Sequence, residues 1–133
     1  MTECRLKVIH VIERVSQDNH GIIEAALSTA EILRGEYGIH SELWFPEDGS
    51  ESHPFELRRA ELVSLGTQPK VSELIESRAI DPANTVIVTH GCWRMPTALG
   101  ATFRKAGFPW VYVPHGMLEP WSLGQKAFKK QIY

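Results

Sequence analysis

Two runs of β-branched and aromatic residues, each followed by a His-Gly pair, most constrain what this chain can fold into. Residues 85–89 precede His90-Gly91, and residues 110–113 precede Pro-His-Gly at 114–116. Runs of this length and composition predict buried β-strands. In open α/β sheets, ligands bind outside the carboxyl ends of the strands. We therefore expect both His-Gly pairs to line one polar cleft.

The rest of the chain alternates between strand and helix patterns. Apolar, β-branched character marks strands in the following segments: 6–12, 39–45, 60–65, 85–89 and 110–113. Apolar residues at helical spacing mark helices in the following segments: 22–34, 69–79, 95–106 and 121–132. Strands alternating with helices favour a parallel sheet covered on both faces. The expected fold is α/β, a Rossmann-like three-layer α/β/α arrangement with a parallel sheet of about five strands.

Composition limits the size and the surroundings of the protein. The chain of 133 residues suits one domain, and 43% of its residues are hydrophobic. Its net charge of −2 gives no basic surface of the kind that nucleic acids need, so no nucleic-acid partner is expected. There is no apolar signal core and no apolar run of membrane-spanning length, and Cys4 and Cys92 form no disulfide framework. These features favour a cytoplasmic location.

The common metal and cofactor motifs are missing from the sequence. Six histidines occur, but none lie at HxxxH or HExxH spacing, so no metal site is expected. The chain has neither the GxGxxG dinucleotide fingerprint nor a phosphate-binding P-loop, and it has no GxSxG nucleophile elbow. We therefore expect no bound cofactor.

The loop before the first helix contains His20-Gly21. Backbone N–H groups and the positive end of the helix dipole would favour an anion there, so both residues are candidate substrate-binding residues. An equally weighted alternative is that Asp18 or Asn19 caps the helix and that Gly21 only relieves crowding.

The first strand end contributes His90, Gly91 and Trp93 as candidate substrate-binding residues. The imidazole of His90 can donate to a sugar hydroxyl or a phosphate oxygen, and Gly91 lets a ligand approach the backbone. The alternative for this pair is a turn with an exposed histidine. Trp93 can stack on a sugar ring, although packing against the core is the more common fate of tryptophan.

The second strand end is the stronger candidate, with His115 as the expected catalytic residue. A neutral imidazole at a strand end can bind a hydroxyl group or act as an acid or a base. Gly116 permits a tight turn, and Glu119 can orient His115 or bind a substrate hydroxyl. Alternatively, Glu119 is a first-turn helix residue placed near the helix dipole. His10 and His40 lie within strand patterns, and we interpret both as structural.

The two strand ends resemble a known family. The motifs are His-Gly-x-Trp at 90–93, Gly-x-Pro at 107–109 and Pro-His-Gly-Met-Leu-x-Pro-Trp at 114–121, followed by a helix with Lys126, Lys129 and Lys130. They resemble the N-terminal domain of GT-B retaining glycosyltransferases of family 4, the glycosyl transferase group 1 enzymes of bacterial polysaccharide assembly. The resemblance covers most of the chain and is weakest over 46–81.

The resemblance implies two Rossmann-like domains that face each other across a cleft. The N-terminal domain of such enzymes mainly binds the acceptor, and the C-terminal domain holds the nucleotide-sugar. His115 would then lie near the transferred sugar, and the His20-Gly21 loop near the donor phosphates or the acceptor. Members of the family usually carry Gly-Gly in that loop, where this chain has His20-Gly21.

From the resemblance we expect residues 1–133 to be an incomplete, acceptor-side N-terminal domain. The donor-binding domain, with its paired-glutamate motif, is absent from the sequence. The parent enzyme would be a hexosyltransferase that moves a sugar from a nucleotide-sugar to a saccharide or lipid-linked acceptor, and the chain alone would be inactive. Contact with the inner face of the cell membrane, a donor-domain subunit and a homodimer are all compatible with the sequence. The alternative is a non-catalytic Rossmann-like module that binds a sugar or phosphate or docks a partner.

Overall fold

The computed structural model describes residues 5–13, 20–46, 61–66, 69–91 and 95–115. Strands and helices follow each other along the chain in the order β1 (Lys7–Val11), α1 (His20–Leu27), α2 (Ala30–Tyr37), β2 (His40–Phe45), β3 (Glu61–Ser64), α3 (Val71–Ser77), β4 (Thr85–His90), α4 (Met95–Lys105) and β5 (Trp110–Val113). All five predicted strands are present, each within two residues of its expected limits.

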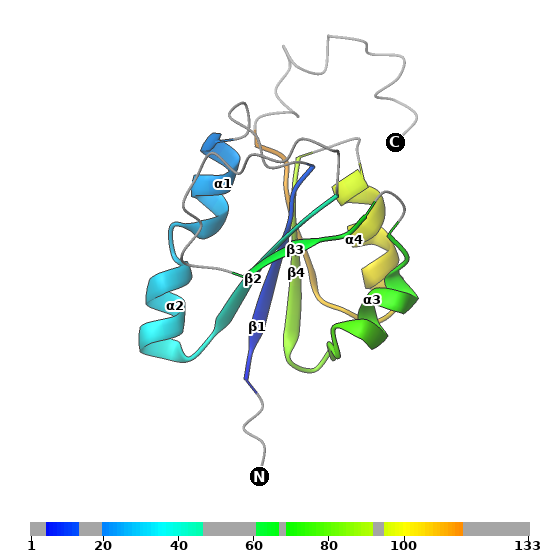
Figure 1. The fold of residues 1–133 in the computed structure, drawn as a ribbon, viewed down its shortest axis with the longest axis horizontal. Coiled ribbons are helices and arrows are strands. Elements are labelled where there is room, and N and C mark those ends of the chain that lie inside the picture. The colour runs from blue at the N-terminus through cyan, green and yellow to red at the C-terminus, as the bar shows by residue number, and fades with distance from the viewer. Residues whose placement is uncertain (1–4, 14–19, 47–60, 67–68, 92–94, 116–133) are drawn as a thin grey trace, which may run out of the picture.

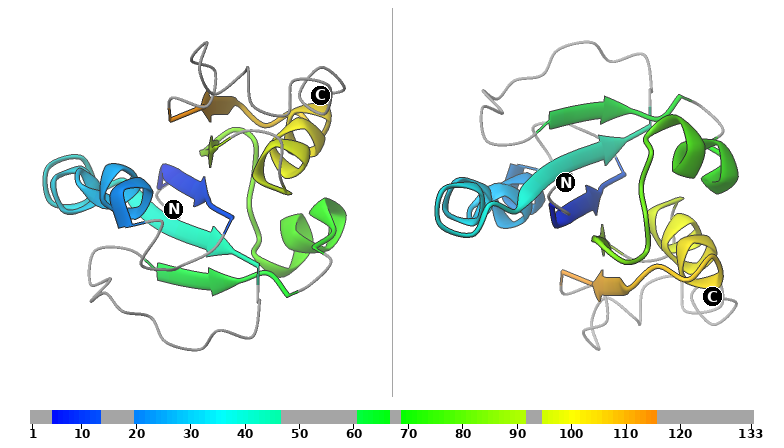
Figure 2. Two further views of the ribbon diagram at one scale, coloured as in Figure 1. Left: turned by 90° about the horizontal axis from the view of Figure 1, so that it is seen from above. Right: turned by 90° about the horizontal axis from the view of Figure 1, so that it is seen from below.

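The strands form one parallel sheet in the order β3-β2-β1-β4-β5. Helices α1 and α2 lie on one face of the sheet, and α3 and α4 lie on the other (Figures 1 and 2). This is the predicted α/β, Rossmann-like arrangement of three layers. Because all the strands are parallel, their carboxyl ends meet at one end of the sheet, where α1 and α4 begin (Figure 1).

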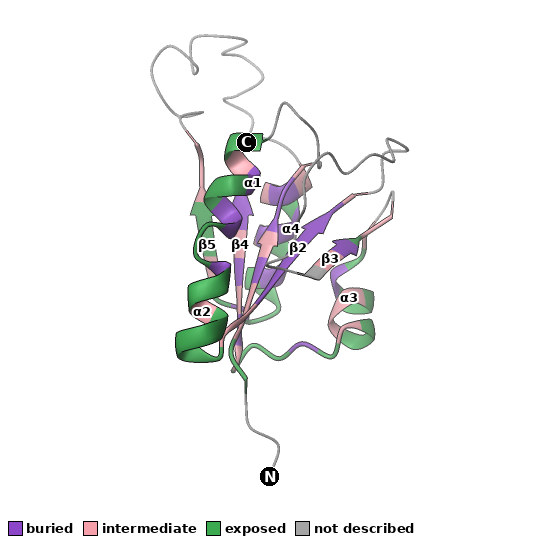
Figure 3. Cartoon of the chain, turned by 60° about the vertical axis from the view of Figure 1, so that its left-hand side comes forward, coloured by how far each residue is buried: buried purple, intermediate pink, exposed green. Residues whose placement is uncertain are grey.

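The inner strand β2 is buried along almost its whole length, whereas buried and half-buried residues alternate along β1 and β4 (Figure 3). Successive side chains of a strand point to opposite faces. On the α3 and α4 side, Ile9 and Val11 of β1 join a large apolar cluster that includes Trp44 and Phe103. On the other side, Ile12 joins a smaller cluster with residues of α1 and β2.

The predicted helix over 22–34 is wrong in its limits. It begins earlier, at His20, and is divided into α1 and α2 at Ser28 and Thr29. The hydroxyl of Ser28 donates to the carbonyl of Ala25 at 3.5 Å, and serine and threonine compete in this way with the backbone bonds of a helix. The second helix continues through Gly35 and ends at Gly38, which has a φ of 65°. Glycine adopts this left-handed conformation readily, and it is the usual way to end a helix.

Three further predictions lie outside the described residues: the polar loop that follows β2, the helix over 121–132, and its lysines Lys126, Lys129 and Lys130. Within the described part of the chain, none of the helices has the length and apolar character needed to cross a membrane.

Candidate functional site

Three histidines from three different strands form a hydrogen-bonded row at the carboxyl end of the sheet. Nδ1 of His10 lies 2.9 Å from Nε2 of His90, and Nδ1 of His90 lies 2.7 Å from Nε2 of His115. Neighbouring rings are tilted by only 34° and 29° relative to each other. We call His10, His90 and His115 the histidine row.

The register of the sheet explains why these histidines meet. His10 of β1 pairs with Val88 of β4, and His90 lies two residues beyond Val88. His90 in turn pairs with Val113 of β5, and His115 lies two residues beyond Val113. A step of two residues keeps a side chain on the same face of a strand. The row therefore crosses one face of the sheet diagonally, on the side of α1 and α2.

Burial keeps the row uncharged at neutral pH. It lowers the pKa of His10 to about 4, because the protonated ring would lose its hydration. Burial, together with repulsion from the charged forms of His10 and His115, lowers the pKa of His90 to about 3. Burial also lowers the pKa of His115. Each ring then has one N–H donor and one bare nitrogen acceptor.

The backbone around the row is held in an unusual conformation. His115 has a φ of 50°, a left-handed conformation that few residues other than glycine adopt, although histidine does so more often than most. Gly91 has a φ of 90°, and its N–H donates to the carbonyl of Val113 at 2.8 Å. The hydroxyl of Thr97 in α4 donates to the carbonyl of Gly91 at 3.3 Å. These bonds fix the turn after β4 against β5 and α4.

The opposite face of the sheet supports the row through close packing. Nε1–H of Trp110 donates to the hydroxyl of Thr89 at 2.8 Å, directly before His90 in sequence. A Cβ atom at Gly100 in α4 would lie 2.3 Å from Nε1 of Trp110 and 2.8 Å from Cγ2 of Thr89. Only glycine lets α4 approach β4 and β5 so closely.

The structure brings together part of the predicted site. His90, Gly91 and His115 meet at the carboxyl end of the sheet, as the strand-end rule predicts. His20 and Gly21 are exposed first residues of α1 rather than loop residues, and α1 begins at the same end of the sheet (Figure 1). The other predicted binding residues lie outside the described residues: Trp93, Gly116 and Glu119.

His10 was missed as a site residue, because its position within a strand suggested a structural role only. The available signal was the place of His10 in the alternation of side chains along β1. His10 and Ile12 share one face of β1, and the strand order typical of Rossmann-like folds places β4 beside β1. A polar residue near the carboxyl end of the first strand then lies within reach of the end of the fourth.

A second polar cluster lies on the other face of the sheet, around Glu42 of β2, whose side chain is only 1% exposed. The carboxylate lies 3.2 Å from Nζ of Lys7 and 3.1 Å from the guanidinium of Arg78. It also accepts a hydrogen bond from Nε1–H of Trp44 at 2.9 Å. We call these four residues the Glu42 cluster. Glu42 was not among the residues predicted from the sequence to form a site.

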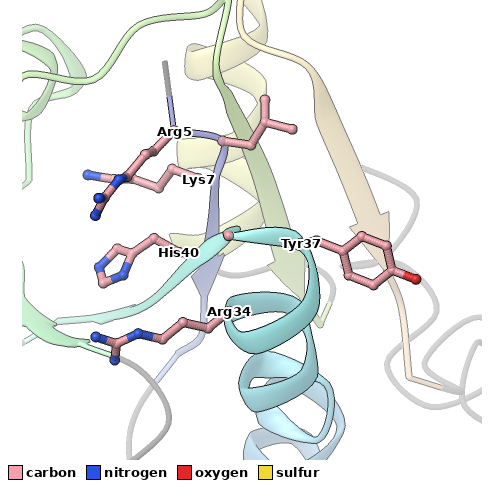
Figure 4. A pocket seen from close by; sticks show the side chains of 7 residues that line it. Arg5, Lys7, Arg34, Tyr37 and His40 are labelled. Carbon is pink, nitrogen blue, oxygen red and sulfur yellow. The ribbon is translucent and has the colours of Figure 1, made fainter. Parts of the chain in front are cut away.

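The amino end of the sheet also carries a basic pocket, with a volume of about 850 Å³. Arg5, Lys7, Arg34 and His40 extend to the same side, whereas Tyr37 points the other way (Figure 4). Because Lys7 also contacts the buried carboxylate of Glu42, the pocket and the Glu42 cluster share one cation.

Neither polar cluster is a metal centre. Among the described residues, no three histidine, cysteine or acidic side chains converge as ligands of one ion. In the histidine row, His90 turns its two nitrogens toward two different rings, so the three imidazoles cannot share a metal. The row can therefore bind hydrogen-bonding groups and transfer protons, and neutral imidazoles are suited to both.

Comparison of the chain with protein-family models, with curated proteins and with solved structures gives no match.

Proposed function

We propose that this chain is the acceptor-side domain of a GT-B glycosyltransferase in polysaccharide or glycan biosynthesis. The parent enzyme would transfer a hexose from a nucleotide-sugar to a saccharide or lipid-linked acceptor at the inner face of the membrane, without a metal. The donor-binding domain would be supplied by another part of the protein or by a separate subunit, so this chain alone would be inactive.

The observation that carries the proposal is the meeting of His90 and His115 at the carboxyl end of β4 and β5. Both residues belong to the His-Gly motifs on which the family resemblance rests. A Rossmann-like sheet with polar groups at this end supports a ligand site, because ligands bind there in such folds. The fold by itself is shared by many activities, so the glycosyltransferase assignment depends on these motifs.

The chemistry suits a neutral histidine. In glycosyl transfer, the bond between the anomeric carbon and the leaving phosphate oxygen breaks, and a bond to an acceptor hydroxyl oxygen forms, with loss of the hydroxyl proton. His115 uses Nε2 within the histidine row, so Nδ1 is the nitrogen that can face a substrate hydroxyl. A hydrogen bond from that nitrogen would orient the sugar beside the reacting atoms.

The test is an NMR titration of the chain with a panel of short oligosaccharides and nucleotide-sugars. Saccharides should shift the backbone amides of His90, Gly91 and His115, whereas nucleotide-sugars should bind weakly. His115→Ala removes one hydrogen bond to the ligand and should weaken saccharide binding about tenfold. His40→Ala, at the opposite end of the sheet, is the matched control and should leave the affinity unchanged.

Tight nucleotide binding at α1 with no response to any saccharide would refute the acceptor-side assignment. The chain would then be a nucleotide-binding module. A saccharide affinity that is equal in the wild type and in His115→Ala would remove His115 from the site.

A further inference from the structure

The hydrogen bonds of the histidine row restrict how its protons can be arranged. A neutral imidazole has one donor and one acceptor nitrogen. The row contains two contacts, from Nδ1 of His10 to Nε2 of His90 and from Nδ1 of His90 to Nε2 of His115. Each contact needs one N–H and one bare nitrogen, because two facing N–H groups repel each other and two facing bare nitrogens form no bond.

Only two arrangements of neutral rings satisfy both contacts. In the first, Nδ1 carries the proton in all three rings, so His115 offers an N–H donor at Nδ1. In the second, Nε2 carries the proton in all three rings, and Nδ1 of His115 is a bare acceptor. Every mixed arrangement loses at least one hydrogen bond and leaves a polar nitrogen without a partner, which is unfavourable in a buried site.

We propose that the histidine row is a coupled proton relay in which His10 and His90 are positioning residues that set which nitrogen of His115 carries the proton. Starting from the arrangement in which Nδ1 carries the proton in all three rings, a proton that arrives at Nε2 of His10 moves one proton across each contact and releases one from Nδ1 of His115. One proton enters and one leaves, so the row changes tautomer without gaining charge. This inference concerns the free protein and does not depend on the proposed transferase function.

Within the described part of the chain, the groups around the row favour coupling within it over coupling to other groups. On this face, the paired residues of the strands are apolar: Leu43 beside His10, Val88 beside His10, and Val113 beside His90. The helices on this side carry the following charged or titratable residues, all exposed to solvent: His20, Glu24, Glu31, Arg34, Glu36 and Tyr37. The causes of the lowered pKa values are burial and, for His90, the two flanking imidazoles.

The first test is the ring-nitrogen NMR spectrum of the wild-type chain labelled with ¹⁵N-histidine at pH 7. The relay requires His10, His90 and His115 to share one tautomer, either all Nδ1–H or all Nε2–H. Two different tautomers within the row would overturn the proposal, and no variant is needed to observe them.

The second test substitutes the end of the row that does not touch His115. His10→Leu should change the ring-nitrogen shifts of His115 from those of one tautomer to those of a mixture, although the row joins these rings only through His90. His10→Asn should change them less, because its amide still gives Nε2 of His90 a hydrogen-bonding partner, which leucine lacks. His20→Gln, which changes an exposed histidine of α1, is the matched control and should leave the spectrum of the row unchanged.

Unchanged shifts of His115 in His10→Leu, with backbone amide shifts elsewhere like those of the wild type, would show that His10 has no influence on His115. A change caused equally by His10→Leu and His10→Asn would indicate packing alone. Failure of the relay leaves the saccharide titration unaffected as a test of function, because that titration compares ligands rather than tautomers.

Discussion

The two ends of the sheet bury polar groups in opposite ways. At the amino end, the Glu42 cluster surrounds one buried carboxylate with Lys7, Arg78 and the N–H of Trp44. At the carboxyl end, the histidine row contains no paired ions, and its rings are kept neutral by burial. One cluster stabilises a charge with opposite charges, and the other avoids charge altogether.

This difference separates structural from chemical roles. A buried ion pair is locked in place, because removing one partner leaves an uncompensated charge. Neutral hydrogen-bonded rings cost little to bury and can still accept or release a proton. We therefore expect substitutions in the Glu42 cluster to change stability, and substitutions in the histidine row to change chemistry and pH dependence.

The largest expected effect is at the amino end. Replacing both cations, with Lys7→Met and Arg78→Met, leaves the Glu42 carboxylate buried without a countercharge and should lower the free energy of unfolding by about 3–5 kcal/mol. Urea denaturation at pH 7 measures this loss. Adding Glu42→Gln to the double variant is the control, and it should recover most of the stability because the charge is gone. A double variant as stable as the wild type would mean that the Glu42 carboxylate does not depend on its two cations.

The second expected effect distinguishes the ends by pH. The unfolded chain protonates His90 near pH 6.5, but the folded chain does so only near pH 3, so the unfolded state binds more protons between these values. Stability should therefore fall as the pH falls from 7 to 4.5, by about 2–3 kcal/mol from His90. Denaturation curves at both pH values measure the change. His90→Gln should remove this part of the pH dependence and leave the part that His10, with a pKa of about 4, contributes. A profile as steep as that of the wild type would assign the effect to other groups.

The smallest expected effect tests the packing under the carboxyl end. Gly100→Ala forces a methyl group against Trp110 and Thr89 and should lower the free energy of unfolding by about 1–3 kcal/mol. Gly35→Ala is the matched control, since no atom lies within 4 Å of the added Cβ. It should stabilise α2 by about 0.5–1 kcal/mol. Thermal unfolding of the two variants should thus give shifts of opposite sign, and a shared sign would contradict the described contact.

Much of the fold follows from the sequence. Dense runs of valine and isoleucine, such as those of β1 and β4, predict strands of the sheet. Their burial on both faces is not borne out, since Val8, Val86 and Val88 are only half-buried. The strand-end rule locates His90 and His115. The division of α1 from α2 does not follow, because Ser28 and Thr29 fall between the apolar positions, and the helical spacing of those positions continues past them. Helical periodicity shows which face of a helix is apolar. It does not show where a serine hydroxyl competes for a backbone carbonyl.

The two polar clusters are harder to predict, because they depend on which strands are neighbours. His10 and His90 are 80 residues apart, and Glu42 and Arg78 are 36 residues apart. A histidine or a glutamate within an apolar strand pattern shows only that a partner is needed. Its identity requires the strand order and the register, which local patterns do not contain.

Because the histidine row crosses the strands diagonally, its hydrogen bonds form only when those strands are paired in the correct register. A slip of one residue between β1 and β4, or between β4 and β5, would turn a histidine to the opposite face and separate the rings. The row exists only when strands from both halves of the chain have paired in register. Because such long-range pairings are slow to form, the ring nitrogens of His90 should report when β1, β4 and β5 have reached their final register.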